Sequence, residues 1–153
     1  MTPQEVVIVD YSPDCGRELV AMWRESFERA VGVTDPHPLE EQLPYLEEKV
    51  LPENQVLVVL EKSTSAVIGF MASTPERIAQ LYVHVNYQNR GIGSTLVNLA
   101  KQRSGGRLRL FTFKANKPAQ RFYERHGFKM IGQGFEEEWQ LEDLEYAWSA
   151  SAT

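Results

Sequence analysis

The sequence has a single cysteine, Cys15, among its 153 residues. One cysteine cannot form a disulfide within the chain, which agrees with a reducing compartment. A catalytic thiol needs an electropositive niche, whereas Asp14 and Glu18 stand near Cys15 in the sequence, so we interpret it as a structural or surface thiol. The three histidines are scattered and no Cys/His ligand spacing is present, so we expect no metal site.

Long hydrophobic runs and basic stripes are also missing. No apolar segment approaches the roughly 20 residues that span a bilayer, and residues 1–5 lack the basic and apolar segments of a secretory signal. We therefore expect a cytoplasmic protein with no membrane partner. Lysine and arginine total 16 against 21 aspartate and glutamate, a formal net charge of −5. This balance argues against nucleic acid as the main partner and favours a cationic partner such as an amine.

Length and composition are typical of one globular domain. The chain of 153 residues is long enough to bury one core, so we predict a single domain over residues 1–153. Hydrophobic residues make up 42% and charged residues 24%, which is typical of a soluble globular protein. The sequence has no internal repeat, low-complexity segment or linker that would divide it further.

What is present is a pair of glycines between a strand pattern and a helix pattern. Apolar residues alternate along 78–85, the period of a strand, and recur at helical spacing along 94–100. Gly91 and Gly93 allow a tight turn in which backbone N–H groups converge on the start of a helix, where the dipole favours negative charge. This arrangement predicts a phosphate or pyrophosphate site, with Arg90 as an added charged contact. A plain tight turn explains the two glycines equally well, since the Walker A lysine and the third glycine of a dinucleotide fingerprint are missing.

Two blocks of the sequence resemble one known family. The stretch 88–93, Gln-Asn-Arg-Gly-Ile-Gly, resembles the acyl-CoA pyrophosphate loop Q/R-x-x-G-x-G/A of the GNAT superfamily of N-acetyltransferases, and residues 81–84 look like that family's fourth strand. Residues 116–128 resemble the family pattern N-x-x-A-x-x-F/L-Y-x-x-x-G-F. A strand-like segment, 108–113, separates the blocks. Two patterns in the family's order are more specific than either alone, and the resemblance covers residues 78–130.

The resemblance implies a fold and an activity. The fold is an α/β (α+β) GNAT-like domain with a mixed, mostly antiparallel central sheet flanked by helices. The implied enzyme moves an acetyl group from acetyl-CoA directly to a primary amine, in a small molecule or a peptide, without a covalent enzyme intermediate. A homodimer is also a family habit, although no stretch of the sequence identifies an interface. The rival from another class is a non-catalytic acyl-CoA-binding or sensing module, and a nucleotide-binding protein unrelated to CoA is a third interpretation.

The resemblance also implies which residues hold acetyl-CoA. Backbone N–H groups of the glycine loop would bind the pyrophosphate, and the preceding strand would hydrogen-bond the pantetheine amides, with an N–H near Tyr82 or Val83 polarising the thioester carbonyl. Asn116 would contact pantetheine, cap the following helix, or do both. The predicted cofactor-binding residues are therefore Leu81, Tyr82, Val83, Gln88, Asn89, Arg90, Gly91, Ile92, Gly93, Ser94 and Asn116.

Tyr123 and Glu76 are the predicted catalytic residues. Tyr123 stands at the family's general-acid position, where a phenol with a pKa near 10 can protonate a departing thiolate if position and local field assist, and plain packing is its alternative role. Many family members carry a carboxylate base at the start of the fourth strand. Here Arg77 aligns with that place, which leaves the neighbouring Glu76 as the candidate base. His84, a water chain, or an aromatic amine substrate that needs no base are the alternatives.

Hydrophobic periodicity and turn signals predict the remaining elements. The predicted strands are 6–9, 55–61, 67–73, 78–85, 107–113, 128–132 and 139–148, and the predicted helices are 12–31, 39–50, 94–104 and 116–127. By the resemblance, the first two helices and the loop between them border the acceptor pocket. His37, Glu41 and Tyr45 are therefore candidate acceptor contacts.

Overall fold

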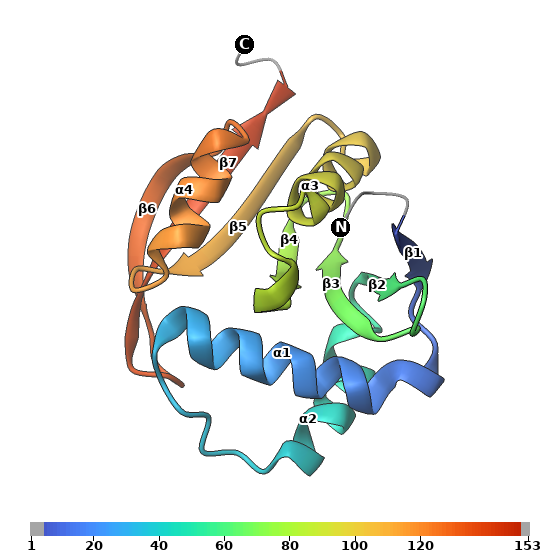
Figure 1. Cartoon of the computed structure of the whole chain (residues 1–153). Coiled ribbons are helices and arrows are strands. Elements are labelled where there is room, and N and C mark those ends of the chain that lie inside the picture. Colours follow the sequence, from blue (N-terminus) through green and yellow to red (C-terminus); the bar gives the residue numbers. More distant parts are fainter. Residues whose placement is uncertain (1–4, 151–153) are drawn as a thin grey trace.

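The computed structural model describes residues 5–150, which form seven strands in two antiparallel sheets (Figure 1). The strands are β1 (Val6–Asp10), β2 (Gln55–Glu61), β3 (Val67–Ser73), β4 (Ile78–Val83), β5 (Arg107–Phe113), β6 (Lys129–Glu136) and β7 (Leu141–Ser149). The first sheet has the order β1-β2-β3-β4 and the second has the order β5-β7-β6. The mostly antiparallel arrangement is as predicted, but the central sheet is divided in two.

Helices cover both faces of the first sheet and one face of the second (Figure 1). They are α1 (Gly16–Val31), α2 (Leu39–Tyr45), α3 (Ile92–Arg103) and α4 (Lys117–Arg125), with short helical turns η2 (Pro13–Cys15), η3 (Leu46–Val50) and η4 (Val85–Tyr87). Within residues 5–150, none of these helices combines the length and apolarity that crossing a membrane requires.

Strands β2 and β3 send side chains into two apolar cores, because successive side chains of a strand point to opposite faces. Val56 and Val58 pack in the core under α1, whereas Leu57 and Val59 pack in the core shared with α3, α4 and the second sheet. Helix α1 covers its core with the stripe that its sequence spacing predicts: Leu19, Val20, Trp23 and Phe27.

Most predicted elements are confirmed, and several have the predicted bounds. The three strands predicted at 55–61, 67–73 and 107–113 coincide with β2, β3 and β5. The predicted strand 128–132 is longer in the structure, because pairing with β7 continues as far as Glu136.

Two predicted helices differ from the structure near prolines. Ser12 caps the turn as predicted, but Pro13–Cys15 is a 3-10 turn and the α-helix begins only at Gly16. The predicted helix 39–50 changes after Tyr45 into the π-helical turn η3. Pro44 lies at this change, and a proline inside a helix lacks the N–H that a regular helical ladder needs.

Within residues 5–150, one isolated backbone bridge joins the two sheets, at the start of β4. Arg77 forms an isolated parallel bridge with Arg109, whose backbone N–H donates to the carbonyl of Glu76 at 3.0 Å. Ala79 is an extra residue in the β3–β4 register, because Gln80 pairs with Ala72 and Ile78 with Ser73. Among the pairings within residues 5–150, none joins β4 to β5 beyond that bridge, so the two strands diverge and leave backbone groups unpaired along both edges.

The end of α1 gives a test of the fold. Gly32 ends this helix with φ of 81°, and its N–H donates to the carbonyl of Glu28 at 2.9 Å. We expect Gly32→Ala to lower the free energy of unfolding by about 1 kcal/mol, because a Cβ disfavours this left-handed conformation. Urea denaturation measures the change. Gly105→Ala is the control, since Gly105 has no positive φ and a Cβ there would meet open space. Equal losses in both variants would contradict the prediction.

Candidate active site

Two cavities lie where β4 and β5 diverge, and they share part of their walls. The larger, about 700 Å³, extends between η4, the start of α3 and α4, and reaches α1. The smaller, about 190 Å³, is lined by β4, β5, β6 and β7. The residues that line both are Leu81, Tyr82, Asn116, Ala119 and Tyr123. These residues separate the two cavities and are accessible from each.

The glycine loop presents the N-terminus of α3 to the larger cavity. The first hydrogen bond of the helix runs from Thr95 N to Gly91 O at 3.0 Å, so the amides of residues 92–94 precede the helical ladder. Gly91 has φ of 87°, which only glycine adopts without strain. The Gln88 side chain donates to the carbonyl of Val83 at 2.8 Å and fixes the loop against β4. The structure therefore brings the predicted loop residues to a cavity with free N–H donors.

Gly93 also allows α3 and α4 to pack closely, which the sequence analysis did not predict. Its φ is not positive, but a Cβ there would lie 3.1 Å from the Phe122 ring. The missing side chain lets α3 approach α4 closely beside the cavity. Arg90 differs from its predicted place, because its guanidinium lies over the Tyr87 ring, 5.7 Å from the centroid, and does not line the cavity.

The charged side chains that line the two cavities have opposite signs. The larger is lined by Arg29, Arg121 and Arg125 and by no aspartate or glutamate among the described residues. The smaller is lined by Glu136 and Asp143 and, in the same part of the chain, by no lysine or arginine. An anion is therefore favoured in the larger cavity and a cation in the smaller.

The register of β4 decides which of its backbone groups face the opening. His84 N donates to Ile68 O at 2.8 Å, and hydrogen bonding alternates along an antiparallel pair. The N–H of Tyr82 therefore faces β3, whereas those of Leu81 and Val83 point to the open edge. Sequence analysis did not decide whether an N–H near Tyr82 or Val83 would donate to the thioester carbonyl. The register of β4 favours the N–H of Val83.

Tyr123 lies where the cavities meet. Its side chain is 7% exposed, with the rings of Phe122 and Phe128 edge-on to it at 5.2 and 5.6 Å. Burial, and secondly the nearby Tyr82, raise the pKa of Tyr123, so its phenol is protonated throughout the physiological range. Burial likewise raises the pKa of Tyr82 to about 12. Within residues 5–150, the hydroxyl of Tyr123 has no hydrogen-bond partner, so it can bond a ligand in either cavity.

Asn116 caps α4, as predicted. Its side-chain oxygen accepts from Ala119 N at 3.2 Å, and the residue is buried and lines both cavities. The oxygen has a second lone pair and the amide nitrogen has two donors, so capping leaves room for a ligand contact.

The candidate bases Glu76 and His84, and also Cys15, make contacts of their own outside the walls of the two cavities. Glu76 is exposed, and its backbone carbonyl, not its carboxylate, contacts Arg109. His84 accepts from Asn86 N at 3.1 Å through Nδ1. Cys15 donates from Sγ to a backbone carbonyl at 3.1 Å. None of Glu76, His84 and Cys15 lines either cavity.

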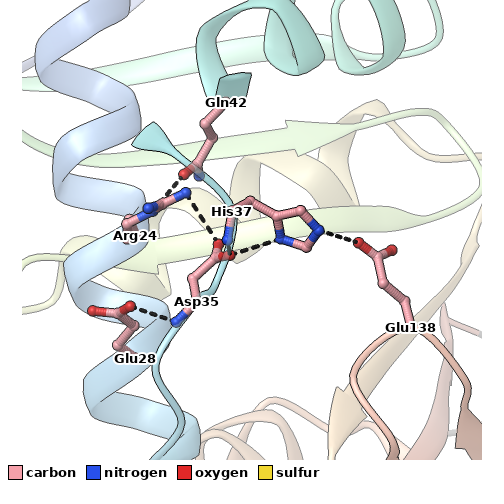
Figure 2. Close-up of polar contacts among 6 residues, drawn as sticks. All are labelled: Arg24, Glu28, Asp35, His37, Gln42 and Glu138. Atoms are coloured by element: carbon pink, nitrogen blue, oxygen red, sulfur yellow. Dashed lines mark hydrogen bonds and ion pairs between the residues drawn. The ribbon is translucent and has the colours of Figure 1, made fainter. Parts of the chain in front are cut away.

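A polar cluster joins the α1–α2 loop to the turn between β6 and β7 (Figure 2). His37 lies between two carboxylates, with Nδ1 2.8 Å from Asp35 Oδ1 and Nε2 3.9 Å from Glu138 Oε1. Arg24 anchors Asp35 at 3.3 Å. The outer polar cluster consists of Arg24, Glu28, Asp35, His37, Gln42 and Glu138. The cluster brings the loop and the turn into contact, but the predicted acceptor contacts His37, Glu41 and Tyr45 line neither cavity.

The charged residues of both cavities were missed by sequence reasoning. Arg121 and Arg125 stand four apart on α4, and this spacing could have placed them on one face. Glu136 and Asp143 gave no such signal, because their side of the sheet depends on the register between β6 and β7.

A cavity with helix N-terminal amides and arginines, beside an open strand edge, offers the groups that suit a phosphate-bearing ligand in extended form. Comparison with known proteins identifies the class. The family described as "Acetyltransferase (GNAT) domain" matches residues 52–130. A peptidyl-lysine N-acetyltransferase, YjaB, of Salmonella typhimurium is 32% identical over 121 residues, which cover 77% of this chain and 79% of that protein. The chain therefore belongs to the GNAT acetyltransferase family.

Solved structures share the whole fold. The apo-form of YjaB from Escherichia coli has a TM-score of 0.76 at 23% identity, covering 94% of this chain and 97% of that one. The PaiA N-acetyltransferase of Thermoplasma acidophilum, in complex with coenzyme A, has a TM-score of 0.72 at 21% identity, covering 94% and 98%. These likenesses confirm the predicted GNAT-like fold.

His126 lies beside the glycine loop and gives a test of the site's electrostatics. Its Nε2 is 3.0 Å from Ser94 Oγ, and burial, followed by the positive charges of Lys101 and Arg125, lowers its pKa. Since the fold favours the neutral ring, its contribution to stability is present above pH about 6.5 and is lost as the pH falls through the lowered pKa. We expect His126→Gln to lose less stability than wild type between pH 7 and 5, measured by urea denaturation. Parallel pH profiles would contradict this assignment.

Proposed function

We propose that this acetyltransferase moves the acetyl group of acetyl-CoA directly to a primary amine. One observation carries the proposal: the cavity with cationic walls and a helix N-terminus also reaches Tyr123, a buried residue whose hydroxyl has no hydrogen-bond partner within residues 5–150. The relatives support it, since YjaB of Salmonella typhimurium is a peptidyl-lysine N-acetyltransferase and the PaiA structure holds coenzyme A.

The residues present fit acetyl-CoA in the larger cavity. The amides of residues 92–94 and the guanidinium groups of Arg121 and Arg125 would hold its phosphates, because all of them offer N–H donors to an anion. The open edge of β4 would pair with the pantetheine amides as a neighbouring strand does. The cavity volume of about 700 Å³ is within the usual range for a cofactor site.

The reaction sets the tasks of the site. The amine nitrogen forms a C–N bond to the thioester carbonyl carbon of acetyl-CoA, and the C–S bond breaks. The sulfur leaves with the electron pair and takes up one proton. A second proton of the original ammonium passes to solvent. The N–H of Val83 at the open edge of β4 would stabilise negative charge on the carbonyl oxygen. Tyr123 would deliver the proton to sulfur and regain one from the new amide nitrogen.

Tyr123 can act as an acid despite its raised pKa. A thiol in water has a pKa near 8.5, so proton transfer from an ordinary phenol to a thiolate is uphill. A thiolate formed beside Tyr123 would be buried too, and burial raises the pKa of a thiol as well. Because both groups are buried, the difference between the pKa of the Tyr123 phenol and the pKa of the thiol is smaller than if only the phenol were buried. Glu76 has no part in this proposal, because its carboxylate lies outside both cavities.

Removing the Tyr123 hydroxyl tests the chemistry. We expect Tyr123→Phe to lower kcat about 100-fold without changing the affinity for acetyl-CoA, since general acid catalysis contributes on this scale. The release of free CoA thiol in the presence of a lysine-containing peptide measures the rate. Tyr146→Phe is the matched control, because Tyr146 is also buried, donates to Glu124 at 2.9 Å and lines neither cavity. Full activity of Tyr123→Phe would refute the acid role, and acetyl-CoA binding without thiol release in wild type would favour the non-catalytic module.

The glycine loop can be tested by binding. We expect Gly91→Glu to weaken acetyl-CoA binding at least about tenfold in calorimetric titration, because it adds negative charge to the anion site and strains a φ of 87°. Gly106→Glu is the control, because Gly106 also has a positive φ and open space but lies outside both cavities. If both variants bind acetyl-CoA like wild type, the loop does not hold the phosphates.

A further inference from the structure

We infer that the smaller cavity binds the acceptor and that Glu136 and Asp143 select an acceptor whose amine is positively charged. The inference rests on the proposed function, because it needs acetyl-CoA in the larger cavity. Its starting point is that the two cavities share Tyr123 and Asn116, so a ligand in the smaller one would reach the end of the larger one.

Asp143 is placed by its neighbours on both sides in the second sheet. It pairs with Phe113 of β5 and with Gly134 of β6. A Cβ on Gly134 would lie 2.9 Å from Asp143 Oδ1, so the carboxylate lies across β6 at a position where that strand has no side chain. No cation within residues 5–150 pairs with Asp143, although Asp143 is only partly exposed.

Glu136 is held in place by the turn that follows it. Its two carboxylate oxygens accept from Glu138 N at 3.2 Å and from Trp139 N at 2.7 Å. Each oxygen has about two lone pairs, so both can accept a further hydrogen bond from a ligand. Glu136 stands two residues after Gly134, the partner of Asp143, so both carboxylates lie on one face of the sheet.

Aromatic side chains complete the walls of the smaller cavity. Phe111 is 62% exposed, an unusual position for a phenylalanine, and Phe113 lies two residues further along the same face. Aromatic rings attract an ammonium and also pack against an aliphatic chain. Arg109, a cation two residues before Phe111 on the same face of β5, is already paired with Glu145. The walls therefore suit an alkylammonium group such as a lysine side chain.

The inner end of the cavity supplies an independent indication of a ligand. Tyr123 is more than nine-tenths buried and lines this cavity, and its hydroxyl has no partner among residues 5–150. In the outer polar cluster, His37 Nε2 lies 3.9 Å from Glu138 Oε1, in the turn whose Glu138 N–H donates to Glu136. The carboxylates stabilise the charged form of the amine, so their role is to select the acceptor and not to deprotonate it.

The test uses the intact protein loaded with CoA, which has no acetyl group to transfer. A short end-blocked peptide with one lysine is titrated calorimetrically, and its counterpart with norleucine has the same chain without the charge. We expect the lysine peptide to bind at least about tenfold more tightly. Asp143→Asn and Glu136→Gln should each weaken lysine-peptide binding about fivefold and leave CoA binding unchanged. Glu142→Gln is the control, because Glu142 is exposed and contacts Lys114 at 3.8 Å outside the cavity.

The outcomes separate this inference from the proposed function. Equal affinity for the two peptides, or unchanged lysine-peptide binding in both Asp143→Asn and Glu136→Gln, overturns the inference even if acetyl transfer is observed. Failure of wild type to bind CoA, or binding without acetyl transfer to any amine, overturns the proposed function. Thermal unfolding checks that each variant is folded. If Glu136→Gln disturbs its turn, Asp143→Asn still decides, because Asp143 takes no part in that turn.

Discussion

The separation of β4 from β5 is the constraint on which the rest of the site depends. In the part of the chain that the structure describes, a single backbone bridge between Arg77 and Arg109 joins the two sheets, and the extra residue Ala79 interrupts the β3–β4 register just beyond it. Divergence leaves the N–H groups of Leu81 and Val83 without a neighbouring strand. Unpaired backbone donors are costly to bury, so a ligand that hydrogen-bonds to this edge gains binding energy. In a continuous sheet, the next strand would form these hydrogen bonds instead.

The two sheets also separate charge. Arginines from α1 and α4 and the start of α3 surround the larger cavity, whereas the carboxylates of β6 and β7 surround the smaller one. Tyr123 lies between them in a buried environment where charged groups interact strongly. In the proposed function, an anionic donor of the acetyl group and a cationic acceptor would therefore reach the same hydroxyl from opposite sides, each through walls of the opposite charge.

Sequence reasoning succeeded where the signal is local. The helix cap at Asn116, the end of α1 at Gly32 and the turn at Gly91 each depend on residues a few positions apart, and the structure confirms all three. It was less reliable where distant segments meet. Arg90 was expected at the anion site but lies over Tyr87, and Glu76 was considered as a base although its carboxylate lies outside both cavities.

The sequence alone determined the order of strands and helices, the family, and the loop and tyrosine at the centre of the proposed site. Periodicity, caps and glycines act over a few residues, so they are visible without the fold. Only the tertiary structure decided that Gly93 makes room for Phe122, that Val83 and not Tyr82 faces the open edge, and that Glu136 and Asp143 share a face. Those facts follow from helix packing and from strand register, where a shift of one residue turns every side chain to the opposite face.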